Sequence, residues 1–136
     1  MSNILKISEA ASIGLHSMIM LAENPDKLLS VKDIAKEFDI SANHLSKVLQ
    51  RLVKAELVIS IKGAKGGFRL AKKPDEIAFI EIYEAIDGKF NPSDCLLNKN
   101  VCQKGTCIMH GLVASVNKQV KEYFQDTKLS SFVKKK

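Results

Sequence analysis

Residues 30–54 read SVKDIAKEFDISANHLSKVLQRLVK, and this stretch decides the fold. Ser30 is a good helix N-cap, and Asp33 three residues later suits a capping box. The apolar face that follows, as far as Phe38, predicts a first amphipathic helix. Ser41 is the next N-cap candidate, and the apolar residues after it are spaced i, i+3, i+4, i+7 and i+8, which predicts a second amphipathic helix. Because only about three residues separate the helices, the stretch is typical of a helix-turn-helix. The two apolar faces are Val31, Ile34, Ala35 and Phe38, then Leu45, Val48, Leu49, Leu52 and Val53.

The hydrophobic period changes directly after this unit. Residues 57–62 (LVISIK) alternate as a strand does, residues 63–67 (GAKGG) read as a turn, and residues 68–74 (FRLAKKP) resume as a strand. This pattern predicts a two-stranded hairpin with a basic, glycine-rich tip. A helix-turn-helix followed at once by such a hairpin is a winged helix.

Positive charge is concentrated in the same region. The whole chain has 21 Lys and Arg against 15 Asp and Glu, a net charge of +6. Between residues 41 and 73 there are eight basic residues and one acid, Glu56, so this quarter of the chain carries more than the whole net charge. Such segregation indicates a polyanionic partner, and the alternative is a solvated helix face and turn. The basic residues are Lys47, Arg51, Lys54, Lys62, Lys65, Arg69, Lys72 and Lys73.

Further amphipathic helices are expected on both sides of the winged helix. Apolar residues recur every three or four positions over residues 7–22 and over 78–87. A longer helix is expected over about 106–124. Its narrow apolar stripe suits packing on a second chain, as in a coiled coil. The alternative is that the stripe packs on its own domain. Residues 130–136 (SSFVKKK) are expected to form a frayed basic end. The residues expected to face inward in the 78–87 helix are Ile80, Tyr83, Ala85 and Ile86, and the dimerisation stripe is Met109, Leu112, Val116, Val120 and Tyr123.

Composition narrows the class of protein. A chain of 136 residues with 46% hydrophobic residues can build one packed domain. The start lacks the charged region and cleavage site of a signal peptide, and no run approaches 18 apolar residues, so we expect a cytoplasmic protein without a membrane span.

We expect no enzyme, because GAKGG lacks the strand-to-helix context of a nucleotide-binding loop. In the cytosol, three clustered cysteines indicate metal ligands or redox thiols rather than disulfides.

The candidate metal site is the sequence C-x6-C-x4-C-x2-H formed by Cys95, Cys102, Cys107 and His110. Thiolates are the preferred ligands of iron–sulfur clusters, and imidazole can replace one or two of them. If the last helix starts near Thr106, the final cysteine and the histidine share one face of it. Spacings of six and four suit a loop around a cluster and fit poorly with the close cysteine pairs of structural zinc. Zinc and free redox thiols remain as alternatives.

From Ile7 to Leu129 the chain resembles the IscR/NsrR/CymR family of dimeric bacterial winged-helix regulators. The resemblance rests on SVKDIAKEFDIS, HLSKVLQRLVKAELV, GAKGGFRLAKKPDEI, EAIDG, the three cysteines and VNKQV. It implies a mainly α fold with a small β-hairpin wing, divided into a winged helix-turn-helix domain (1–87), a cluster-binding loop (88–105), and a dimerisation helix with a basic tail (106–136). One departure is Glu56, where the family usually has glycine.

The resemblance also implies a cofactor, an iron–sulfur cluster held by the three cysteines and a fourth ligand that varies by branch, with [2Fe-2S] favoured over [4Fe-4S]. CIMH resembles the IscR branch, in which the histidine, here His110, is a ligand. In the NsrR branch the fourth ligand is an acid from the first helix of the other subunit. Ser12 occupies that position here, with Glu9 one turn earlier. The CymR branch implies a regulator without a cluster, controlled by a partner protein, a small ligand or cysteine oxidation.

We therefore expect a homodimeric repressor that binds a palindromic operator in double-stranded DNA, with its affinity gated by a cluster that senses redox state, nitric oxide, oxygen or iron–sulfur supply. Two recognition helices would enter successive major grooves about 34 Å apart. A metal carrier or assembly scaffold is the alternative outside DNA binding. The expected base-reading residues are Ala42, Asn43, His44, Ser46 and Lys47, and the expected phosphate or minor-groove contacts are Ser30, Lys32, Ser41, Arg51, Lys62, Lys65, Gly66 and Gly67.

Overall fold

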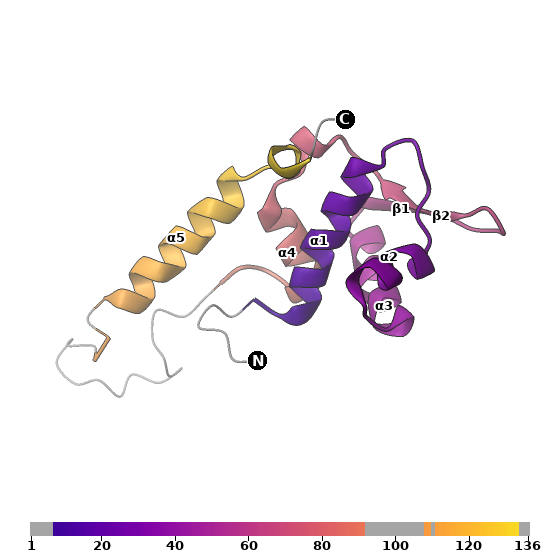
Figure 1. The fold of residues 1–136 in the computed structure, drawn as a ribbon. Helices are drawn as coiled ribbons and strands as arrows, with labels where there is room; N and C mark the ends of the chain where they lie inside the picture. The colour runs from indigo at the N-terminus through magenta and orange to yellow at the C-terminus, as the bar shows by residue number, and fades with distance from the viewer. Residues whose placement is uncertain (1–6, 92–107, 110, 134–136) are drawn as a thin grey trace.

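The structure is a computed structural model that describes residues 7–91, 108–109 and 111–133 (Figure 1). Its described part is mainly helical with one antiparallel hairpin, so the predicted fold class is confirmed. The elements in chain order are α1 (Glu9–Glu23), α2 (Val31–Phe38), α3 (Ala42–Lys54), β1 (Val58–Ile61), β2 (Gly67–Leu70), η1 (Pro74–Glu76), α4 (Phe79–Asp87), α5 (Leu112–Asp126) and η3 (Leu129–Phe132).

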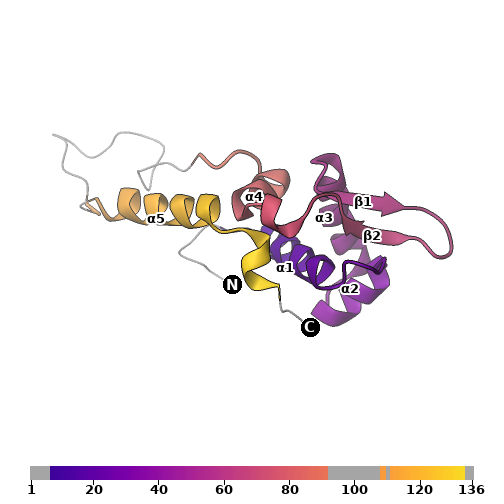
Figure 2. The same cartoon turned by 90° about the horizontal axis from the view of Figure 1, so that it is seen from above.

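The core lies where α1, α3 and α4 meet, with α2 packed on α3 (Figures 1 and 2). The hairpin projects from one side of this body, and α5 extends away on the other side. Burial of each large apolar side chain contributes about 1.5–3 kcal/mol, so the stripe of α3 is a main source of stability. The largest fully buried apolar side chains are Met18, Leu21, Ile34, Leu45, Leu49, Leu52, Ile77, Ile82 and Leu129.

The caps predicted for the helix-turn-helix are confirmed. Ser30 Oγ accepts from Asp33 N at 3.1 Å, and Asp33 Oδ2 accepts from Ser30 N at 3.0 Å, which completes the capping box. The backbone and hydroxyl of Ser30 also hold the pKa of the Asp33 carboxyl below its usual value. Ser41 Oγ accepts from His44 N at 3.0 Å and starts α3. Asp39, in the left-handed conformation, ends α2, so the turn between the helices is short and well defined.

The glycines of the hairpin allow close backbone approach, within the hairpin at Gly66 and against Leu29 at Gly67. β1 pairs with β2 in the register Val58↔Leu70 to Ile61↔Gly67, and Leu29 adds a bridge to Phe68 through hydrogen bonds of 2.8 and 3.1 Å. A Cβ on Gly66 would lie 2.0 Å from the carbonyl oxygen of Ile61, and one on Gly67 would lie 2.8 Å from that of Leu29. Only glycine allows the backbones to approach this closely.

Glu56 adopts a left-handed conformation with φ of 64° where α3 turns into β1. A residue with a Cβ pays a steric penalty there, so we expect Glu56→Gly to raise the free energy of unfolding by about 1 kcal/mol. Chemical denaturation measures this change. As a matched control, Glu37→Gly within α2 should lower stability by a similar amount, because helical backbone disfavours glycine. A Glu56→Gly variant no more stable than the wild type would contradict the expected strain.

The inward face predicted for α4 is only partly correct. Phe79, Ile82 and Ile86 are buried, whereas Ile80, Tyr83 and Ala85 are half-buried. The reason is that α4 has neighbours on more than one side: α1 and α3 cover the buried face, and the end of α5 packs near the other. Tyr83 therefore lies in an aromatic cluster instead of the main core, with ring centroids 5.8 Å from Phe124.

The C-terminal part differs from the prediction at both ends. The last long helix begins at Leu112 and not near Thr106, because Gly111 takes a left-handed conformation with φ of 80° and residues 108–109 form a turn. The frayed end predicted for residues 130–136 is wrong for its described part. Residues 130–132 belong to η3, and the ring of Phe132 stacks on that of Phe79 with centroids 5.5 Å apart. Leu129, at the start of η3, is fully buried and its N–H donates to Ile77 O at 2.8 Å.

Candidate DNA interface and cluster ligands

The N-terminal end of α3 presents the predicted base-reading residues together. Ala42, Asn43, His44 and Lys47 are exposed and Ser46 is half-buried, while the opposite face of the helix is buried in the core. Ser41 is exposed beside them and holds the first turn in place. Because first-turn side chains of a recognition helix reach base edges, this end of α3 can read a major groove.

The cations predicted to contact phosphate lie on α2 and on the hairpin. Lys32 is exposed in the first turn of α2, next to the half-buried cap Ser30. Lys62 and Lys65 are exposed in the loop that joins β1 to β2, which projects from the body (Figure 2). An exposed lysine on a projecting loop can reach a phosphate without moving the rest of the fold.

The two wing glycines have a packing role. Gly67 is buried with the backbone of Leu29 close against it, and the DNA contact expected of it stays a prediction. Gly66 is half-buried and its N–H donates to Gly63 O at 3.0 Å, which closes the turn of the hairpin. The sequence signal for a basic, glycine-rich tip was correct, but glycine serves close backbone contact there and the lysines carry the charge.

Arg51 has a partner that was not predicted. Its Nη1 donates to the main-chain oxygen of Ile86 at 2.7 Å, across from α3 to the C-terminal end of α4. The phosphate contact expected of Arg51 therefore remains a prediction. A phosphate would compete with the Ile86 carbonyl for the same guanidinium.

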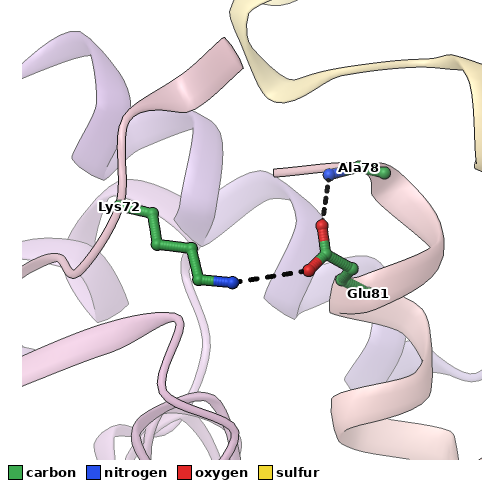
Figure 3. A network of polar contacts seen from close by, with 3 residues as sticks. All are labelled: Lys72, Ala78 and Glu81. Carbon is green, nitrogen blue, oxygen red and sulfur yellow. Dashed lines mark hydrogen bonds and ion pairs between the residues drawn. The ribbon is translucent and has the colours of Figure 1, made fainter. Parts of the chain in front are cut away.

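A second polar network joins the base of the wing to the start of α4 (Figure 3). Glu81 Oε2 accepts from the N–H of Ala78 at 2.8 Å and so caps the helix from within, and Glu81 Oε1 lies 3.7 Å from Lys72 Nζ. Both charged side chains are more than a third exposed, so the ion pair itself contributes little, about 0–1 kcal/mol. Lys72 was counted with the basic region and is partly neutralised by this pair.

The predicted cluster ligands Cys95, Cys102, Cys107 and His110 all lie outside the described residues. Within residues 7–91, 108–109 and 111–133 there is no group of three His, Cys, Asp or Glu placed to hold a metal ion. The alternative fourth ligands are described: Glu9 is exposed in the first turn of α1, and Ser12 is half-buried.

His16, a second histidine near that end of α1, has a structural partner. Its Nδ1 donates to Ser12 O at 2.7 Å, and its ring meets Phe38 edge-on with centroids 6.2 Å apart. These two contacts give His16 a structural role where α1 meets α2.

The helix-turn-helix, the wing and the exposed cations around them define a winged-helix DNA-binding protein. None of the described helices has the length and apolar character that a bilayer crossing requires. The family comparison gives the particular kind of winged helix: a model described as "Rrf2: Iron-dependent Transcriptional regulator" matches residues 7–135. The chain belongs to the Rrf2 family of transcriptional regulators, and it is not an enzyme.

Individual relatives confirm the resemblance to the IscR, NsrR and CymR regulators. The transcriptional regulator NsrR of Bacillus subtilis is 37% identical over 100 residues, covering 72% of this chain and 68% of NsrR. The transcriptional regulator IscR of Aliivibrio salmonicida is 33% identical over 128 residues, covering 93% of this chain and 71% of IscR. The solved structure of CymR, described as the global cysteine regulator of B. subtilis, matches with a TM-score of 0.77 at 31% identity, covering 93% of this chain and 95% of CymR.

Proposed function

We propose that this regulator is a cytoplasmic homodimeric repressor whose operator affinity is gated by a [2Fe-2S] cluster. The observation that carries the proposal is the position of the soft ligands. All three cysteines of the chain, and His110 after them, lie between the end of α4 at Asp87 and the start of α5 at Leu112. This connection joins the winged helix to α5, the helix proposed for dimerisation. A cluster bound in the connection would therefore act on both the winged helix and α5.

The donor set fits an iron–sulfur cluster. Cys95, Cys102 and Cys107 supply thiolates, which such clusters prefer, and His110 supplies an imidazole that can complete the set. A cluster bound there would supply one-electron redox chemistry and reactivity towards oxygen and nitric oxide. The relatives NsrR and IscR, to which the resemblance assigns clusters, support this branch of the family.

The exposed stripe of α5 supports a homodimer. Leu112 is 54% exposed and Tyr123 45% exposed, and Val116 and Val120 between them are half-buried in the single chain. Only Phe124, at the C-terminal end, is buried against the body. A helix that projects from the domain with an apolar stripe along it gains by packing on a second copy. Two copies would then present two recognition helices to a palindromic operator.

Lys65 is proposed to neutralise one phosphate from the tip of the wing. We expect Lys65→Ala to weaken binding to every DNA sequence alike and to reduce the slope of log affinity against log salt by about one. Titrations of labelled duplex over a series of salt concentrations measure both quantities. A variant whose salt slope equals that of the wild type would contradict the proposed wing contact.

Asn43 provides the matched contrast, because it carries no charge and lies in the first turn of α3. Asn43→Ala should leave the salt slope unchanged and should lose about 1–3 kcal/mol of discrimination at one base pair, since asparagine can pair with adenine through two hydrogen bonds. Selection of operators from a random pool shows the relaxed position. If both variants bind like the wild type, α3 and the wing do not dock as proposed.

A second candidate function is a cluster-free regulator controlled by a partner protein, a small ligand or cysteine oxidation. The likeness to CymR favours it. The discriminating experiment is the absorbance spectrum of anaerobically purified protein, with iron and sulfide counted per chain and the spectrum repeated after nitric oxide or oxygen. A visible chromophore with stoichiometric iron and sulfide supports the cluster. Colourless, iron-free protein that binds its operator contradicts the cluster and favours the second candidate.

A further inference from the structure

The contact between Arg51 and Ile86 joins the recognition helix to the segment that leads towards the cysteines. A hydrogen bond from a guanidinium is charge-assisted, and at 2.7 Å it is a short one. Its acceptor belongs to the last turn of α4, where helix carbonyls have no partner within the helix. The described last turn of α4 contains no basic residue, so Arg51 brings from α3 the positive charge that this helix end requires.

The same end of α4 holds two other parts of the chain. Ser8 Oγ, at the N-cap of α1, donates to Asp87 Oδ1 at 2.7 Å. Glu84 Oε2 accepts from the N–H of Phe90 at 2.7 Å, and the Phe90 ring meets Tyr83 with centroids 5.5 Å apart. The residues just after α4, which continue into the cysteine segment, are thus held on α4 itself.

Packing at Ile86 makes this end of α4 rigid. Ile86 is buried, and its Cδ1 would lie 2.1 Å from a Cβ placed on Gly14 of α1. Val48 of α3 would lie 3.6 Å from the same Cβ. Three helices therefore converge on the residue whose carbonyl holds Arg51. A close-packed junction of this kind transmits a displacement instead of absorbing it.

The position of Arg51 along α3 does not suit base reading. It lies nine residues beyond Ala42, about 13 Å further along the helix axis at about 1.5 Å per residue. The side chain of Arg51 is exposed overall, and its Nη1 atom donates to the carbonyl of Ile86 in α4. One of its donors is therefore already bonded at a helix end within the fold.

We propose that Arg51 is a positioning residue that couples the cysteine segment to the recognition helix through the C-terminal end of α4. Arg51 sets the position of α3 on the body, and a change at the cysteines reaches it through Phe90, Glu84 and the last turn of α4. The proposal rests on the gating proposed above. It predicts that the reach and geometry of the Arg51 guanidinium, and not only its charge, are required.

The test uses the full-length protein with Arg51→Lys, which keeps the charge and loses the fork, and Arg51→Met, which loses both. Lys54→Met, at an exposed cation in the last turn of α3, is the matched control. The probe is a duplex that the wild-type protein selects from a random-sequence pool. Affinity is measured over a salt series, with iron-loaded protein and with protein from which iron has been removed by a chelator, and thermal unfolding checks that each variant is folded.

We expect both Arg51 variants to bind about tenfold more weakly in the tighter-binding state, with the salt slope of the wild type. The ratio of affinities between iron-loaded and iron-free protein should fall towards one in both. A slope reduced by about one in Arg51→Met and restored in Arg51→Lys would overturn the proposal, because that is the behaviour of a phosphate contact. Wild-type affinity in both variants would overturn it too.

Failure of the gating would be seen separately. If the wild-type protein holds no iron or binds equally in both states, the cluster proposal fails and the ratio is uninformative. The salt series still decides the role of Arg51. Weaker DNA binding by Arg51→Lys at an unchanged salt slope supports positioning through α4. A salt slope that follows the charge of residue 51 overturns the positioning role. Should Arg51→Met fail to fold, Arg51→Lys alone gives the answer.

Discussion

Val116→Asp is expected to convert the protein into monomers. Val116 lies in the middle of the α5 stripe, so a dimer with a symmetric seam would bring two carboxylates into an apolar contact. Burial of an unpaired charge is costly, and here the cost arises twice in one interface. Sedimentation should show a single species of monomer mass. Lys118→Asp, an exposed position on the opposite side of α5, is the control and should remain dimeric.

Operator binding should fall with the dimer. A monomer binds one half-site and loses the gain from linking two binding events, which is on the order of a hundredfold or more. The winged helix itself should remain folded, because Val116 is outside the buried core of the single chain. A Val116→Asp variant that stays a tight dimer would mean that the stripe packs within its own chain.

Replacement of any one of Cys95, Cys102 and Cys107 by alanine is the change with the largest expected effect on the cofactor. Each variant should lose the visible chromophore completely, since two thiolates and an imidazole are too few to hold a cluster in this segment. Absorbance with iron and sulfide counts measures the loss. An alanine variant that keeps full iron, sulfide and colour would remove that cysteine from the ligand set.

His110→Ala should behave differently from the cysteine variants. Imidazole is neutral and more easily replaced than thiolate, so we expect a cluster that assembles but is labile, with a shifted spectrum and altered reduction potential. His16→Ala is the matched control, because that histidine is bonded to Ser12 O. If His110→Ala changes neither spectrum nor potential, the fourth ligand has to be sought first at Glu9 or Ser12 of the partner chain.

Local signals predicted the parts of the fold that depend on neighbours in sequence. Ser30 with Asp33, and Ser41 with the N–H of His44, formed as the capping patterns indicated, because the bonding groups are three residues apart. Glu56 took the left-handed conformation that the glycine of the family suggested.

The parts that the sequence did not predict depend on distant neighbours. The face of α4 was assigned from one apolar stripe, although α1, α3 and the end of α5 cover it from different sides. Residues 130–136 were predicted to fray because no local pattern indicates that Leu129, just before them, pairs with the distant Ile77. For the same reason, no periodicity indicates that Arg51 reaches the carbonyl of Ile86.

The central claim is that cluster state controls operator affinity, and one titration tests it directly. Operator binding is measured on one anaerobic preparation before and after nitric oxide, with the absorbance spectrum recorded on the same samples. We predict that loss of the chromophore and a change in affinity of at least about tenfold occur together, because a useful switch must favour one state by more than about 1 kcal/mol. An operator affinity that stays the same while the chromophore disappears would contradict the claim.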